Sequence, residues 1–124
     1  MRVLIDTHLL LWALSAPSKL SKRARARIDT SEVYVSAASI WEISFKSALG
    51  KVGADPAEVL AAVEPAGFSH LPVLGNHAAG IAALPPILKD PFDRMLVAQA
   101  RSEPMILLTN DDALKGYGDF IEVV

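Results

Sequence analysis

The sequence predicts an α/β fold, a three-layer α/β/α sandwich around a central, mostly parallel sheet. Short runs rich in Val, Ile and Leu alternate along the chain with longer segments of helical period. These runs lack the polar alternation of a half-exposed sheet, so we expect helices to cover both faces. No repeat, linker or low-complexity stretch divides the 124 residues, which indicates a single domain over residues 1–124.

Four strands are expected, at residues 2–5, 33–35, 105–108 and 121–124. Each helix between them is expected to begin after a side chain that accepts hydrogen bonds from the first-turn N–H groups. These candidate N-caps are Thr7, Ser21, Ser36 or Ser39, Asp55 and Asp90. Proline follows both aspartates at the first helical position, as is typical of helix starts. The third helix is expected to end at Gly50, because glycine suits the left-handed conformation there.

The composition restricts the class of protein. The chain has no cysteine, which excludes disulfides and thiolate sites and is typical of a reducing compartment, so we expect a cytoplasmic location. No apolar run approaches the roughly 20 residues that span a bilayer, so we expect no membrane association.

The net charge of −2 alone argues against nucleic-acid binding, but the charges are unevenly distributed. Residues 1–51 contain eight Lys and Arg against four Asp and Glu, whereas residues 52–124 contain four against ten. A basic surface can therefore accompany an acidic site. An RNA-binding face and an ordinary solvated helix are equal alternatives for the basic residues Lys19, Lys22, Arg23, Arg25 and Arg27.

Two aspartates lie just beyond predicted strands. Asp6 follows the strand at 2–5 directly, and Asp111 comes soon after the strand at 105–108. Open α/β sheets bind ligands beyond the carboxyl ends of their strands, so both side chains are expected at that edge. A helix cap or turn is the alternative explanation for each.

Two further acids have local explanations that compete with a functional one. Glu42 can form a capping box with Ser39 or a surface ion pair with Lys46. Asp93 lies in the first turn of a helix that Asp90 would cap, where the helix dipole favours an ionised carboxylate. If these acids converge with those at the strand ends, their repulsion requires a cation, and Mg²⁺ or Mn²⁺ suits an all-oxygen site. Such a metal can activate water for phosphodiester hydrolysis.

Four segments, taken together and in order, resemble the PIN-domain nucleases, and more narrowly the VapC-type toxins of bacterial toxin–antitoxin pairs. They are LIDTHLLLW from residue 4, SAASIWEISFK from residue 36, DPFDRMLVAQA from residue 90 and LTND from residue 108. Each contains one of the four acids, and the resemblance spans nearly the whole chain.

The resemblance implies a PIN-like fold and an endoribonuclease that acts as the toxin of a pair, with Mg²⁺ or Mn²⁺ as cofactor. It also implies homodimerisation and inhibition by a small cognate antitoxin. The residues to which it assigns catalytic and metal-binding roles are Asp6, Glu42, Asp93 and Asp111. The supporting groups that it suggests are Thr7, Asp90, Arg94 and Thr109.

Two other functions remain open. A receiver-like phosphoacceptor domain also gathers acids and Mg²⁺ at strand ends, but such domains usually have paired acids after the first strand, where this chain has Asp6-Thr7-His8. A catalytically inert binding partner is the other alternative, for which an intact set of four acids has no obvious use.

The remaining aromatic and histidine residues are expected to be structural. Trp12 and Trp41 lie in apolar segments of helical period, which favours burial over stacking on bases. His70 and His77 lack the spacing of metal ligands.

Overall fold

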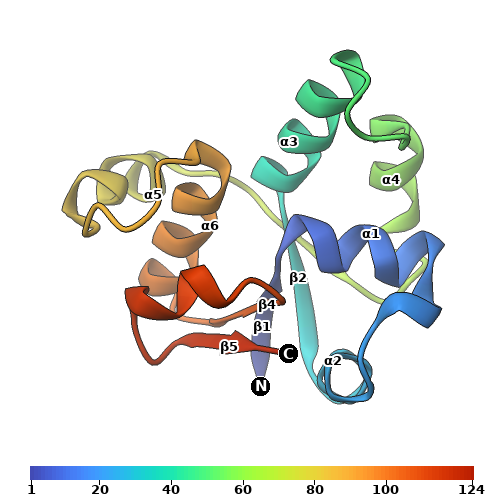
Figure 1. The fold of residues 1–124 in the computed structure, drawn as a ribbon, viewed down its shortest axis with the longest axis horizontal. Helices are drawn as coiled ribbons and strands as arrows, with labels where there is room; N and C mark the ends of the chain where they lie inside the picture. Colours follow the sequence, from blue (N-terminus) through green and yellow to red (C-terminus); the bar gives the residue numbers. More distant parts are fainter.

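The computed structural model describes residues 1–124 as five strands, six α-helices and three short 3₁₀ helices (Figure 1). The strands are β1 (Arg2–Ile5), β2 (Glu32–Ser36), β3 (Ser69–Leu71), β4 (Ile106–Thr109) and β5 (Ile121–Val123). The α-helices are α1 (Thr7–Ser15), α2 (Lys22–Asp29), α3 (Ala37–Ala48), α4 (Pro56–Ala62), α5 (Gly75–Gly80) and α6 (Pro91–Ser102). The 3₁₀ helices are η1 (Pro17–Lys19), η2 (Ile81–Ala83) and η3 (Asp112–Tyr117).

All five strands run parallel, in the order β3-β2-β1-β4-β5. Strand β1 is central: Leu4 is paired with Tyr34 of β2 on one edge and with Leu107 of β4 on the other. The chain adds β2 and β3 on one side of β1 and then returns to add β4 and β5 on the other side. The order therefore reverses between β1 and β4, and ligands of such sheets bind beyond the strand ends at this reversal.

Two apolar cores, one on each face of the sheet, confirm the predicted three layers. Val3 and Ile5 pack into a core with residues of α1, α3 and α4, whereas Leu4 packs into a core built largely from α6. Successive strand residues point to opposite faces, so the continuous apolar run of β1 fills both cores. The two groups of helices lie on either side of the sheet in Figure 1.

Most predicted helix starts are confirmed. The side chains of Ser21, Ser36, Asp55 and Asp90 accept hydrogen bonds from the first turns of α2, α3, α4 and α6. The prediction that Thr7 caps the first helix is wrong, because Asp6 is the cap. Of the two candidate caps for α3, Ser36 is the cap and Ser39 lies within the helix, which excludes the capping box considered as one alternative for Glu42.

Two short elements were missed by the sequence prediction. Strand β3 has three residues, and two of them are exposed at the sheet edge, so it has no apolar run. Helix α5 spans only six residues and begins and ends with glycine. The predicted burial of Trp41 is wrong as well, since this side chain is 57% exposed on α3. No helix combines the length and apolar character needed to cross a membrane.

Gly118 provides a test of the turn between η3 and β5. Its φ is +146°, and a Cβ added there would lie 2.9 Å from a ring carbon of Phe120. We expect Gly118→Ala to lower the free energy of unfolding by about 1–3 kcal/mol, because an L side chain is strained in this conformation. Gly53→Ala is the control, since a Cβ there meets nothing within 4 Å. Equal urea midpoints for the two variants would contradict this expectation.

Candidate active site

Asp6 lies where β1 passes into α1, at the reversal of the strand order. Its side chain is 7% exposed. One carboxylate oxygen accepts the Leu9 N–H at 2.9 Å, and the other accepts the Thr109 hydroxyl at 2.5 Å. Burial raises the pKa of Asp6, and these two hydrogen bonds partly offset that rise. The carboxylate is therefore held in one orientation at the carboxyl edge of the sheet.

Thr109 connects the ends of β1 and β4. Its hydroxyl donates to Asp6 and accepts the backbone N–H of Asp111 at 3.0 Å. Asp111 is exposed, and its side chain caps η3 by accepting the Ala113 N–H at 2.9 Å. The two acids expected at strand ends are thus joined through a single buried threonine, which gives Thr109 a direct supporting contact.

Asp93 is the carboxylate most affected by its surroundings. Burial first, and then repulsion by neighbouring carboxylates, raise its pKa from 3.8 to about 7. The neighbours responsible are Asp90, Glu42, Asp6 and Asp111. All four predicted site acids therefore lie in one electrostatic environment, although they come from separate parts of the chain.

Glu42 is 7% exposed on α3 and is paired with the ammonium group of Lys46 one turn later. The hydrogen bond that Lys46 donates to Glu42 is the largest cause of a raised Lys46 pKa, and attraction to Asp90 and Asp93 adds to it. Lys46 therefore provides positive charge within the acid cluster. The i,i+4 spacing of Glu42 and Lys46 predicts only a surface ion pair, because spacing along a helix does not reveal the acids that approach from α6.

The other supporting candidates act on the scaffold of the site. Asp90 accepts the N–H groups of Phe92 and Asp93 and so fixes the start of α6. The Thr7 hydroxyl donates to Ser39 at 2.9 Å, which joins α1 to α3.

Arg94 extends its guanidinium into the segment before α6. It donates to the backbone carbonyl groups of Ile81, Pro85 and Leu88, at 3.1 to 3.3 Å. This residue holds the loop that leads into Asp90, and any support that it gives the site is indirect.

The donor chemistry of the cluster fits Mg²⁺ or Mn²⁺, because every candidate ligand is a carboxylate oxygen and their mutual repulsion leaves negative charge unbalanced. In the present side-chain arrangement, no three acidic or histidine side chains are spaced to enclose an ion. Asp6, Glu42, Asp93 and Asp111 are the residues that could hold one.

The basic residues of α2 do not line this edge. Helix α2 leads into the amino end of β2, and Arg27 contacts the sulfur of Met1 and forms an ion pair with Glu122 of β5. Figure 1 places α2 beside the N-terminus, at the end of the sheet away from α3. An RNA path from α2 to the acids would have to cross the length of the sheet.

The repulsion at Asp93 predicts that removing its charge stabilises the metal-free fold. Because its folded-state pKa is raised, protonation of Asp93 contributes stability that is complete below 3.8 and is lost as the pH rises through about 7. We expect Asp93→Asn to melt at a higher temperature than the unsubstituted chain at pH 8 in EDTA, with a smaller gain at pH 5. The exposed Asp119→Asn is the control. A gain that is absent at pH 8 would contradict the repulsion.

Comparison with known proteins identifies the family. Residues 3–119 match the PIN domain. No curated protein matches the chain. The fold is similar to VapBC2 from Rickettsia felis bound to promoter DNA, with a TM-score of 0.70, 11% identity and coverage of 100% of this chain and 98% of that chain.

Two further structures are similar. DNA-bound VapBC from Salmonella typhimurium has a TM-score of 0.66 and 19% identity, covering 100% of this chain and 97% of that one. FitAcB from Neisseria gonorrhoeae has a TM-score of 0.67 and 22% identity, covering 98% and 95%. At these identities the likeness shows a shared fold, whereas the family match extends over almost the entire sequence. The chain therefore belongs to the PIN domain family, a family of nucleases.

Proposed function

We propose that this chain is an endoribonuclease that depends on Mg²⁺ or Mn²⁺ and acts as the toxin of a toxin–antitoxin pair. Its family supplies the reaction class, hydrolysis of a phosphodiester bond. The observation that supports the metal-dependent part is the repulsion of the buried Asp93 by Asp90, Glu42, Asp6 and Asp111, which together with burial raises the pKa of Asp93. A bound divalent cation would neutralise this negative charge and remove the repulsion between the carboxylates.

In this proposal Asp6, Glu42, Asp93 and Asp111 hold one or two divalent ions, directly or through water. A bound ion would supply an activated water and neutralise charge on the phosphate. The chain's own residues prepare the site: Thr109 orients Asp6, and Asp93 must lose its proton before it can act as a ligand. No side chain has to serve as a nucleophile.

Lys46 would have two uses at such a site. Without an ion it offsets the charge of Glu42, which lowers the repulsion that the fold must tolerate. With the carboxylates neutralised by an ion, its ammonium would be available to donate to a phosphate oxygen of the substrate.

The proposed partners are an RNA substrate, a small cognate antitoxin and a second copy of the chain, in the cytoplasm. The resemblance of the four motifs to VapC-type toxins supports the RNA and the antitoxin. The similar folds were determined as VapBC and FitAcB complexes, and a structure from Klebsiella pneumoniae is described as a toxin–antitoxin complex.

A receiver-like role has less support. A phosphoacceptor aspartate needs a carboxylate oxygen that is free to attack, whereas both oxygens of Asp6 accept hydrogen bonds from the protein.

Removal of single acids tests the nuclease. We expect Asp6→Asn and Asp93→Asn each to lower RNA cleavage by at least about 100-fold with Mg²⁺ or Mn²⁺ present, because each removes a ligand charge. EDTA should abolish cleavage by the unsubstituted chain, and Asp119→Asn should cleave normally. Sequencing of cleaved total cellular RNA would then identify the substrate. Undiminished cleavage by both site variants would refute the assignment.

The antitoxin can be tested genetically and biochemically. We expect a short neighbouring reading frame that encodes a DNA-binding protein with a disordered tail. Its product should co-purify with this chain and inhibit RNA cleavage in proportion to its concentration. Failure of the two purified products to associate would count against the pair while leaving the nuclease assignment intact.

A further inference from the structure

No pair of hydrogen-bonded strands sets the spacing between Glu42 and Asp93. Glu42 lies on α3, which extends beyond the carboxyl end of β2, and Asp93 lies on α6, which packs on the sheet (Figure 1). Their neighbours in the sequence are in contact: the rings of Trp41 and Phe92 meet edge to face, with centroids 4.8 Å apart. Phe92 also contacts the ring of Phe45 on α3, with centroids 5.9 Å apart, so both aromatic contacts depend on one residue of α6. Contacts at one residue leave the two helices free to pivot, so a second point of attachment is needed.

That second attachment is a buried hydrogen bond between Ser36 and Gln99. The Ser36 hydroxyl donates to the Gln99 side-chain oxygen at 2.5 Å, and both residues have no exposed surface. The same hydroxyl accepts the Ala38 N–H at 2.9 Å and so caps α3. The bond therefore joins the N-cap of α3, which is also the last residue of β2, to the body of α6.

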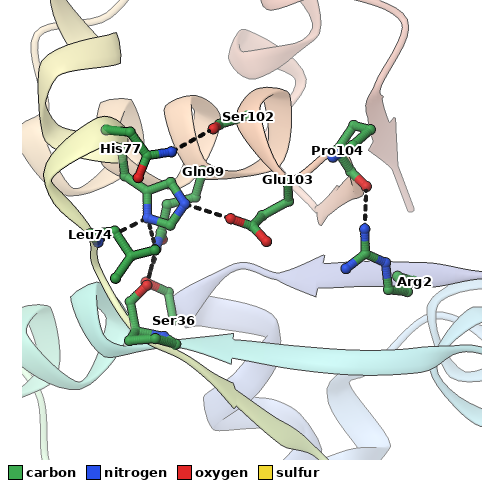
Figure 2. A network of polar contacts seen from close by, with 10 residues as sticks. Arg2, Ser36, Leu74, His77, Gln99, Ser102, Glu103 and Pro104 are labelled. Atoms are coloured by element: carbon green, nitrogen blue, oxygen red, sulfur yellow. Dashed lines mark hydrogen bonds and ion pairs between the residues drawn. The ribbon is translucent and has the colours of Figure 1, made fainter.

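Gln99 is itself held by a polar network, which Figure 2 shows. Its amide nitrogen donates to the Pro72 carbonyl at 3.2 Å and lies 3.4 Å from Nδ1 of His77. The ring of His77 is fully buried, accepts the Leu74 N–H at Nδ1 and contacts Glu103 through Nε2 at 2.6 Å. Because Nδ1 accepts a hydrogen bond, Nε2 carries the proton that is donated to Glu103.

The Ser36–Gln99 bond lies at the same distance along the chain from Glu42 as from Asp93. Glu42 comes six positions after Ser36, the N-cap of α3, and Asp93 comes six positions before Gln99 on α6, which is about 9 Å of helix in each case. A change of angle at the Ser36–Gln99 bond would therefore be carried over equal lengths to both carboxylates.

We infer that Gln99 is a positioning residue: by binding Ser36 it fixes α6 against α3 and so sets the separation of Asp93 and Glu42. This inference rests on the proposed function, because the purpose of the spacing is to hold a divalent ion. An apolar side chain could fill the same space without the cost of burying an amide. A fully satisfied network instead specifies one arrangement of the two helices.

Metal binding measures this role directly. The probe is Mn²⁺, titrated calorimetrically into the intact chain at pH 8. We expect Gln99→Met, which keeps the volume, and Ser36→Ala, which removes one hydroxyl, each to weaken Mn²⁺ binding about 10-fold or more. Since both variants break the same bond, the double variant should be little weaker than either one alone.

Ser21→Ala is the matched control, because it also removes a serine N-cap, from α2, which lies away from the site. It should lower the melting temperature and leave Mn²⁺ affinity unchanged. If Gln99→Met does not fold, Ser36→Ala against Ser21→Ala decides the question. Folded variants that bind Mn²⁺ as the unsubstituted chain does would overturn the inference. Absence of binding by the unsubstituted chain would overturn the metal site itself, and the inference with it.

A distance measurement gives a second readout that needs no metal. The chain has no cysteine, so thiol-reactive spin labels attach only where a cysteine is introduced. Suitable exposed positions are Ser44→Cys on α3 and Lys89→Cys beside the start of α6. We expect a broader or displaced label-to-label distance distribution in Gln99→Met. An unchanged distribution would contradict the positioning role.

Discussion

Pairing of β1 along both of its edges is the constraint on which the rest of the molecule depends. Its residues Val3, Leu4 and Ile5 have no exposed surface and contribute to both cores, and β1 is the middle strand of the five. Because β2 and β4 flank it, the chain must reverse its direction of strand addition beside β1. The carboxyl end of β1 is consequently where helices on both faces of the sheet approach each other, and it is there that Asp6 lies.

Negative charge at this position opposes folding, and several separate contacts stabilise the individual carboxylates. Thr109 and the Leu9 N–H bind Asp6, Lys46 binds Glu42, and the start of α6 accommodates Asp90. Asp93 has no comparable partner, and the raised pKa of its carboxyl is the result. Destabilising charge that is retained in a well-packed domain is typical of functional sites.

Features that depend on neighbouring residues could be predicted from the sequence. Features that depend on contacts between distant residues could not. The caps Ser21 and Asp55 could be identified because a helix start depends on neighbouring residues. Strand β3 exists only through its pairing with β2, and its sequence has no strand pattern of its own. In the site, the strand-end positions of Asp6 and Asp111 followed from the sequence. The Thr109 hydroxyl between them and the environment of Lys46 depend on residues distant in the chain.

Asp6 serves the fold and the site at once, because the carboxylate at the strand end is also the cap of α1. Asp93 makes no hydrogen bond of this kind through its side chain, and its charge destabilises the fold. Loss of Asp93 and loss of Asp6 during evolution would therefore affect the stability of the protein differently. A gene copy that lost Asp93 would still encode a well-folded protein. Loss of Asp6 would instead weaken the protein and hasten its degradation.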